Sequence, residues 1–371
     1  MDRRAFLQSI PAAAVLAAAQ QTPAFAAPQT TASAVPIKLG FDTYSLRAFK
    51  WKAPQLVDYA GRLKLDTIQI SSLDEYESKE PAYLQKIKDQ AARYNMVLDG
   101  GMGSVCPSSH SFKEGPPARE RVLEGLRVAR AVGAKAMRCF MGSSADRTGP
   151  LPIEAHMENT IKVFRSVRSE ALDLGVKIAI ENHDGDMQAR EVKIIIEESG
   201  KDYVGSNLDT GNPLWVVEDP FVTLETLAPY VVTTHIRDSV LFEDPRGAAG
   251  QWVVLGDGTV DFVRFMDRFR ELCPKSSMQL ELITGRPPRI IPYLEPDFWK
   301  AFPKASGAEF ARFVALAKSG HPYMGAMVVE DVAGAKPAIM TDALKEQQRF
   351  DLERSFEYAK KKLNVGINWR T

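Results

Sequence analysis

Short β-rich runs recur along the chain from residue 36 onward, and stretches with a helical spacing of apolar residues separate them. The eight runs cover residues 37–43, 66–71, 96–101, 134–140, 177–181, 204–209, 231–236 and 278–283. Strands that alternate with helices usually pair in parallel, because each helix returns the chain to the same edge of the sheet. The pattern therefore predicts an α/β fold with parallel strands.

The intervening stretches have the periodicity of amphipathic helices. Residues 154–174 and 349–363 each place apolar side chains on one face, and residues 82–94 follow Pro81, a residue favoured at a helix start. The inward side chains are Phe164, Val167, Ala171 and Leu174 in the first stretch and Leu352, Phe356 and Leu363 in the last.

Eight strand and helix units favour closure into a (β/α)8 TIM barrel. The alternative is a doubly wound open sheet, which requires a glycine-rich phosphate turn after the first strand. The segment GFDTYSLRAF at residues 40–49 lacks such a turn, so the barrel is the preferred prediction.

We expect residues 36–371 to form this barrel, with residues 284–345 as an insertion after the eighth strand. The insertion contains one predicted short helix at residues 308–318. Connections of this length are usually functional or part of an interface. Because the segment follows a barrel strand, we expect it on the catalytic face, as a lid or as a contact in a homo-oligomer. A decorative insertion is the alternative.

The first 27 residues have the features of an export signal. Arg3 and Arg4 precede an alanine-rich apolar run, and Ala24-Phe25-Ala26 then supplies a small-x-small cleavage pattern. This arrangement predicts a twin-arginine signal peptide over residues 1–27 and a mature protein in the periplasm.

Composition excludes several classes of partner. The chain has 47 basic and 47 acidic residues, and this balance gives no indication of nucleic-acid binding. Beyond the N-terminus, no apolar run is long enough to predict a membrane span. Cys106, Cys139 and Cys273 are odd in number and widely spaced, which predicts neither a disulfide framework nor a cysteine metal site.

Four consecutive predicted strands end in side chains that bind hard metals. Glu181, Asp209, His235 and Glu281 stand at the carboxyl ends of strands five to eight, where a barrel builds its active site. Each residue alone has an ordinary structural explanation, such as a helix cap for Asp209. Together, three carboxylates and one imidazole suit octahedral Mn²⁺, Mg²⁺ or Co²⁺. The sequence thus predicts a divalent metal site, with Mn²⁺ preferred.

This ligand series resembles the xylose isomerase-like sugar isomerase/epimerase superfamily. The phrase HIRD and the stretch VLGDGTVDF at residues 254–262, which is similar to the family's LGxGxxDF, extend the resemblance over the mature chain. The resemblance implies a small-molecule sugar substrate and a metal ion that stabilises an enediolate. It further implies that Glu181 and Glu281 are both metal ligands and catalytic groups facing the substrate from opposite sides.

Other side chains are expected near the same mouth. His183, two residues beyond Glu181, is predicted to bind a substrate hydroxyl or to act as an acid; a packing role is the alternative. The ketohexose 3-epimerases have an Asn-Arg-Glu element after strand five and a histidine after strand six; this chain lacks the element and has Asn212 in the histidine's place. Asp238 is expected to hold His235 or Arg237 in place, and His156 to face solvent.

Arginines follow several of the strands. We expect Arg138, Arg237 and Arg286 to contact the substrate together with Asn212, because guanidinium groups prefer carboxylates and phosphates. Sugar phosphates are scarce outside the cytoplasm, so an oxidised sugar acid is the more natural anion.

These features favour a metal-dependent lyase that removes CO₂ from a 3-oxo sugar acid, such as a 3-oxo-isoapionate decarboxylase. Isomerisation or 3-epimerisation of a ketose is the next alternative. A 3-keto-glycoside lyase and a non-catalytic sugar-binding protein are further ones.

Overall fold

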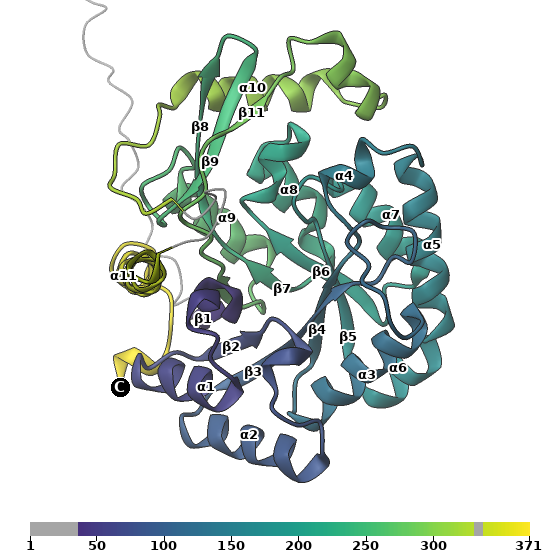
Figure 1. Cartoon of the computed structure of the whole chain (residues 1–371), viewed down its shortest axis with the longest axis vertical. Helices are drawn as coiled ribbons and strands as arrows, with labels where there is room; N and C mark the ends of the chain where they lie inside the picture. The colour runs from purple at the N-terminus through teal and green to yellow at the C-terminus, as the bar shows by residue number, and fades with distance from the viewer. Residues whose placement is uncertain (1–35, 330–336) are drawn as a thin grey trace, which may run out of the picture. The chain divides into compact units, whose positions relative to one another are not determined.

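The computed structural model describes residues 36–329 and 337–371, and its centre is a barrel of eight parallel strands (Figure 1). The strands are β1 (Leu39–Asp42), β2 (Thr67–Ile70), β3 (Val97–Ser104), β4 (Ala136–Phe140), β5 (Lys177–Glu181), β6 (Val204–Asp209), β7 (Val231–His235) and β10 (Met278–Leu280). They pair in the order β10-β1-β2-β3-β4-β5-β6-β7. A parallel bridge between Ile236 and Leu280 joins β7 to β10, so the predicted (β/α)8 barrel is confirmed.

Most of the helices present an apolar face to the barrel, whereas α10 (Gly307–Ser319) belongs to a separate apolar cluster. The helices are α1 (Ala53–Arg62), α2 (Pro81–Arg93), α3 (Ala118–Ala131), α4 (Ser144–Arg147), α5 (Ile153–Ser166), α6 (Arg168–Leu174), α7 (Ala189–Ser199), α8 (Pro220–Leu227), α9 (Phe262–Leu272), α10 (Gly307–Ser319) and α11 (Ala338–Lys361). Short 3₁₀ turns are η1 (Thr43–Phe49), η2 (Leu73–Glu75), η3 (Asn212–Val216), η4 (Ala228–Tyr230), η5 (Pro296–Ala301) and η6 (Asn368–Arg370). In α9, for example, Phe262, Phe265 and Phe269 are all fully buried.

The predicted helices exist, with changed bounds. The stretch 154–174 forms two helices, because the backbone of Val167 leaves helical geometry (φ −117°) between α5 and α6. The stretch 349–363 lies mostly within the longer α11, with Leu352, Phe356 and Leu363 buried as expected. The predicted helix at 308–318 corresponds to α10.

A second, antiparallel sheet lies beside the barrel and was not predicted. It contains β8 (Asp238–Asp244), β9 (Gly247–Val253) and β11 (Arg289–Ile291), and β9 pairs with both of the others. In Figure 1 this sheet and α10 lie on the side of the barrel away from α1 and α2. A separate apolar cluster, which includes Trp215, Leu241 and Phe313, packs it against η3. The role predicted for residues 284–345, as a lid or subunit contact, stays a prediction.

The signal peptide predicted over residues 1–27 lies outside the described residues. Residues 36–371 form one compact unit. Among the described helices, none has both the length and the apolar composition needed to span a membrane. All three cysteines are free thiols in buried positions.

Candidate metal centre

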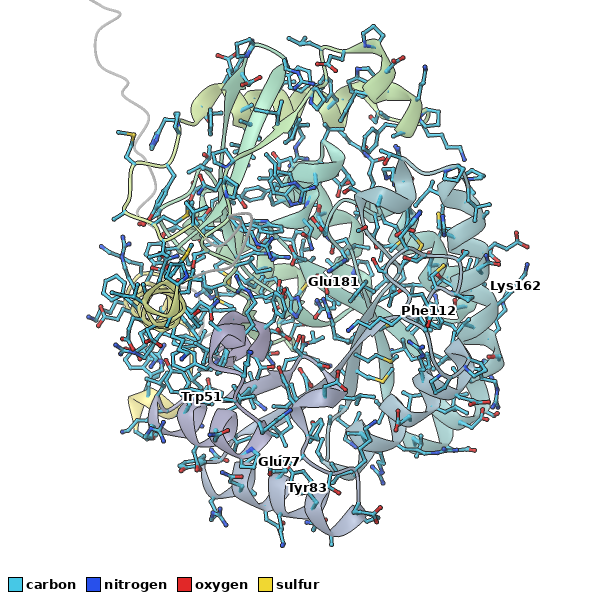
Figure 2. All side chains as sticks on the ribbon, in the orientation of Figure 1. Trp51, Glu77, Tyr83, Phe112, Lys162 and Glu181 are labelled. Carbon is cyan, nitrogen blue, oxygen red and sulfur yellow. The ribbon has the colours of Figure 1, made fainter. Side chains whose placement is uncertain are left out.

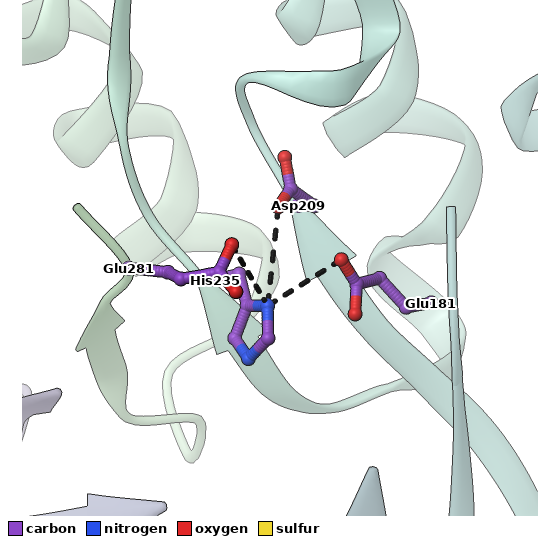
Figure 3. A group of neighbouring side chains, drawn as sticks. All are labelled: Glu181, Asp209, His235 and Glu281. Carbon is purple, nitrogen blue, oxygen red and sulfur yellow. Dashed lines mark ion pairs between the residues drawn. The ribbon is translucent and has the colours of Figure 1, made fainter. Parts of the chain in front are cut away.

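Four side chains meet where strands five to eight of the barrel end. Glu181 ends β5, Asp209 ends β6, His235 ends β7, and Glu281 directly follows β10. One ligand atom from each lies within 4.8 Å of the other three, and all four residues are buried. Figure 3 shows the carboxylates directed toward the His235 ring, and Figure 2 places Glu181 at the centre of the barrel.

The spacing fits a shared ion better than a set of hydrogen bonds. His235 Nδ1 lies 3.4 Å from Glu181 Oε1, 3.5 Å from Glu281 Oε2 and 3.9 Å from Asp209 Oδ2. Nδ1 has no hydrogen-bond partner among the described residues. Ligand atoms that each lie about 2.0–2.2 Å from one ion are themselves about 3–4 Å apart. These four residues could therefore hold a divalent metal.

The other ring nitrogen of His235 has two acceptors. Nε2 lies 2.5 Å from Gln69 Oε1 and 3.4 Å from Asp42 Oδ2. Since an amide oxygen and a carboxylate both accept, Nε2 carries a proton, and Nδ1 is the nitrogen that faces the cluster and would bind an ion. The sequence reasoning missed Gln69 and Asp42, although both are polar residues inside or at the end of an apolar strand.

Gln69 belongs to a polar network inside the barrel. Its Nε2 lies 3.2 Å from Thr233 Oγ1, and Thr233 in turn donates to Asp99 Oδ2 at 2.9 Å. Gln279 also donates to Asp99, at 3.3 Å. Because Thr233 already donates to Asp99, it accepts from Gln69, and this fixes the Gln69 amide with its oxygen toward His235.

Two buried arginines pair with the ligand carboxylates. Arg138 Nε donates to Glu181 Oε2, and Arg237 bonds Asp209 while its Nη1 lies 2.8 Å from Glu281 Oε2. Both arginines were predicted to contact the substrate. In the structure their guanidinium groups contact carboxylates of the cluster, and both side chains also line the pocket above it.

Gly211 allows this approach of Arg237. A Cβ at position 211 would lie 2.7 Å from Arg237 Cγ and 2.8 Å from Trp252 Nε1. The Trp252 ring covers the guanidinium of Arg237, whose central carbon is 4.3 Å from the ring centroid. Burial beneath an aromatic face keeps this charge close to the carboxylates.

Burial and the neighbouring arginines shift the pKa values of the three acids of the cluster in opposite directions. Burial alone raises the pKa of Glu181, but Arg138 and His235 outweigh it and hold the pKa well below its usual value. Burial likewise raises the pKa of Glu281, yet Arg237 and His235 lower it to about 2. At Asp209 burial prevails over Arg237 and raises the pKa to about 7.

A pocket of about 370 Å³ opens above the cluster, and all the remaining predicted site residues line it. These are His183, Asn212 and Arg286, with Arg138 and Arg237 at its base. A volume of this order is at the lower end of the range for small-molecule sites.

His183 is held by two contacts. Its ring stacks on Phe140 with centroids 3.9 Å apart, and Nδ1 donates to the carbonyl of Gly142 at 2.6 Å. Burial lowers the pKa of His183 and favours the neutral ring. With the proton on Nδ1, Nε2 is left as an acceptor, which fits the predicted contact to a substrate hydroxyl better than the acid role.

Asn212 and the segment after β10 complete the pocket. Asn212 Nδ2 lies 3.2 Å from Glu181 Oε1 and 2.9 Å from the carbonyl of Asn182. Arg289, beside Arg286, pairs with Asp184 at 2.6 Å and lies over Trp215.

Two further predictions are wrong. Asp238 holds neither His235 nor Arg237; it accepts the backbone N–H groups of Gly256 and Gly258 at 2.9 and 3.0 Å and so anchors the turn before α9. His156 is 2% exposed and contacts Ser108 Oγ at 2.9 Å, because the loop after β3 covers its face of α5.

Comparison with known proteins agrees with this geometry. Residues 57–290 match the sequence model of the family described as Xylose isomerase-like TIM barrel. The chain is 27% identical over 211 residues to the uncharacterized protein YihM of Escherichia coli K12, which is 56% of this chain and 59% of that protein. It is 24% identical over 237 residues to the 3-oxo-isoapionate decarboxylase of Pectobacterium atrosepticum. This match covers 60% of this chain and 78% of the relative.

Among solved structures, a D-psicose 3-epimerase crystallised with D-fructose superimposes with a TM-score of 0.55. The alignment covers 88% of this chain and 99% of the epimerase at 15% identity, which shows a common fold. A family model that matches most of the barrel and a shared eight-stranded architecture lead to one conclusion: the chain belongs to the xylose isomerase-like TIM barrel family.

Proposed function

We propose that this protein is a divalent-metal-dependent decarboxylase of a 3-oxo sugar acid, with 3-oxo-isoapionate as the type of substrate. Mn²⁺ is the metal we favour, with Mg²⁺ and Co²⁺ as alternatives, because the donor set contains three carboxylates and one imidazole. We place the activity in the periplasm on the strength of the N-terminal sequence.

The charge around the pocket carries this proposal. Four guanidiniums and four carboxylates line the pocket or belong to the cluster: Arg138, Arg237, Arg286 and Arg289, and Glu181, Asp184, Asp209 and Glu281. Arg138, Arg237 and Arg289 pair with these carboxylates, so a bound divalent ion would give this set of paired groups a net positive charge. Such a site attracts an anionic substrate and offsets the charge that develops in the reaction.

A 3-oxo acid suits the residues present. Its C–C bond to the carboxylate breaks, the electron pair moves toward the ketone oxygen, and a proton from water then adds to carbon; the products are CO₂ and a sugar one carbon shorter. When bound, the divalent ion supplies a Lewis acid at the base of the pocket.

The first step needs no base, and the two glutamates make poor ones. Glu181 is paired with Arg138, and Glu281 with Arg237. Ion pairing with a guanidinium stabilises a carboxylate and reduces its tendency to take a proton from carbon. The likeness to the Pectobacterium decarboxylase supports the same choice.

The polar groups of the pocket then orient the sugar. Nε2 of His183 accepts a bond from a substrate hydroxyl. Oδ1 of Asn212 is buried without a hydrogen-bond partner among the described residues and offers a second acceptor. Arg286 and Arg289, from the segment after β10, line the same pocket, and Arg289 is paired with Asp184 at 2.6 Å.

Ketose 3-epimerisation is the second candidate. The observation that favours it is the placement of Glu181 and Glu281 on either side of His235 Nδ1, at 3.4 and 3.5 Å (Figure 3). Two carboxylates that flank a substrate are what removal and return of a proton require.

One assay separates the two. Mn²⁺-loaded protein is incubated in D₂O with 3-oxo sugar acids and with ketohexoses, and the products are analysed by mass spectrometry. Decarboxylation gives CO₂ and a product shorter by one carbon; epimerisation gives deuterium at unchanged carbon number and would refute the first proposal. Glu281→Gln should abolish either activity, whereas Glu218→Gln, a buried glutamate outside the pocket bonded to Thr223, should keep it.

A further inference from the structure

A second cavity adjoins the metal pocket on the opposite half of the barrel mouth. It has a volume of about 480 Å³ and is built from β3, β4 and the segments that follow β1, β2 and β3. Four residues line both cavities: Tyr44, Ser71, Arg138 and Phe140. The metal ligands stand on β5, β6, β7 and just after β10, so the second cavity, which we call the distal groove, occupies the half of the mouth without ligands.

The distal groove begins directly beside the reactive residues. Arg138, which pairs with the ligand Glu181, also donates to the carbonyl of Met102 at 3.4 Å, and Met102 lines the groove. Phe140 forms the border and stacks on His183 on the pocket side. A molecule that reaches past these two side chains would pass from the metal pocket into the groove without leaving the protein surface.

Gly103 provides an independent sign of a ligand. It lies in β3, lines the groove, and has no positive φ, and a Cβ there would meet no heavy atom within 4 Å. Neither backbone conformation nor packing therefore requires glycine at this position. A strand glycine often marks a bulge or the close approach of a ligand. β3 also departs from regular register between Gly101 and Ser104, as strands often do beside active sites.

The lining indicates an uncharged, hydroxyl-rich occupant. Four serines reach the groove: Ser71, Ser72, Ser104 and Ser111. Its cations are largely engaged, since Lys79 pairs with Glu124 at 2.7 Å and Arg121 donates to backbone carbonyls near Pro116. The Tyr44 ring, 39% exposed, supplies an aromatic face at the border. Hydroxyl groups with an aromatic face suit a sugar ring, and the four cations that line the groove are nearly balanced by its three acids, Asp74, Glu114 and Glu124.

We propose that the distal groove binds a second sugar ring, so that the substrate is a 3-oxo aldonic acid carrying a glycosidically linked sugar at its distal end. This rests on the proposed function: the acid and ketone occupy the metal pocket, and the linked ring extends past Arg138 and Phe140 into the groove. The chain would then act on oxidised disaccharides in preference to oxidised monosaccharides.

Binding of two stable acids tests this. Gluconate and lactobionate are titrated calorimetrically into the Mn²⁺-loaded native protein, into Gly103→Phe, whose side chain fills the groove, and into Gly307→Phe. Gly307 lies at the start of α10, and a Cβ there also meets nothing within 4 Å. Thermal melting verifies that both variants are folded.

We expect the native protein to bind lactobionate about tenfold or more tightly than gluconate, a difference of about 1.4 kcal/mol or more. Gly103→Phe should remove this advantage and leave the Kd of gluconate within about twofold, whereas Gly307→Phe should change neither. Equal affinity for the two acids, or an advantage that survives Gly103→Phe, overturns the distal groove while leaving the proposed function intact. Binding of neither acid overturns the sugar-acid function and this proposal with it.

Discussion

Gln69 is expected to control metal affinity without touching the metal. Its Oε1 is 2.5 Å from His235 Nε2 and holds the ring in the tautomer that offers Nδ1 to the ion. In Gln69→Leu this acceptor is lost, and the tautomer with its proton on Nδ1, which cannot bind the ion, becomes populated. Partners of metal-bound histidines typically contribute about 10–100-fold in affinity, or about 1.4–2.7 kcal/mol.

The barrel contains a matched control. Gln279 is as completely buried as Gln69, and its Nε2 likewise contacts two groups, Thr67 Oγ1 at 2.9 Å and Asp99 Oδ2 at 3.3 Å. Gln279→Leu therefore carries a comparable packing and hydrogen-bond penalty but leaves His235 untouched. We expect the two variants to lose similar unfolding free energy, while Gln69→Leu alone loses metal affinity.

Two measurements check this reasoning. Calorimetric titration with Mn²⁺ gives the Kd of each variant, and NMR of the histidine side-chain nitrogens in the metal-free proteins reports the tautomer of His235. If Gln69→Leu leaves the Kd for Mn²⁺ unchanged, or if Gln279→Leu loses as much metal affinity, then Gln69 does not control metal affinity through His235.

Three further predictions follow from the same geometry. Saturating Mn²⁺ at about 100 times its Kd should add about 2.7 kcal/mol to the unfolding free energy, measured by denaturant titration with and without EDTA, and Asp209→Asn should remove most of this increment. Arg237→Met should destabilise the metal-free protein by about 3–5 kcal/mol, because Glu281 is left with a buried charge that Arg237 no longer offsets. Added Mn²⁺ should recover part of the loss in melting temperature; no recovery would contradict the shared site. Burial raises the pKa of Asp99 to about 6, above its unfolded value, so its protonated form stabilises the fold and that stability is lost as pH rises from about 4 through 6. The unfolding free energy of Asp99→Asn, relative to that of the native protein, should therefore increase with pH, by up to about 3 kcal/mol above pH 7. A difference that does not grow with pH would refute this.

The barrel could be predicted because its signals are local. Each strand is a short β-rich run, and each helix carries its own apolar face, so position and type can be read from neighbouring residues. The cluster of Glu181, Asp209, His235 and Glu281 could be predicted for the same reason: parallel strands bring their carboxyl ends to one edge, and a polar residue at the end of each run marks that edge.

The features that could not be predicted from the sequence depend on residues that are distant along the chain. β9 contains Ala248, Ala249 and Gly250, which have little preference for strands, and it forms because β8 and β11 pair on both its edges. The break at Val167 likewise interrupts a continuous apolar periodicity. His156 is buried by a loop some 50 residues earlier in the chain, which helix periodicity cannot reveal.

The arginines show the same limit in the site itself. Their residue type indicated anion binding, and the anions that the structure shows beside them are cluster carboxylates on other strands. Arg138 and Glu181 are 43 positions apart and meet only because β4 pairs with β5, where Phe140 stands opposite Glu181. An arginine at a strand end therefore predicts a neighbouring anion, but the sequence does not show whether the protein or the substrate provides that anion.

The positions of these arginines distinguish the two halves of the barrel mouth, one with the Glu181, Asp209, His235 and Glu281 cluster and the other with the distal groove. Three ligand carboxylates within 4.8 Å of His235 would repel one another without compensation, and Arg138 and Arg237 supply it from inside the pocket wall. The compensation is confined to the half built by β4 to β7 and β10, while the distal groove keeps hydroxyls, Tyr44 and an unfilled position at Gly103. Substitutions in the distal groove should then alter which sugars bind while leaving metal affinity unchanged, because no group in it other than Arg138 touches a ligand among the described residues.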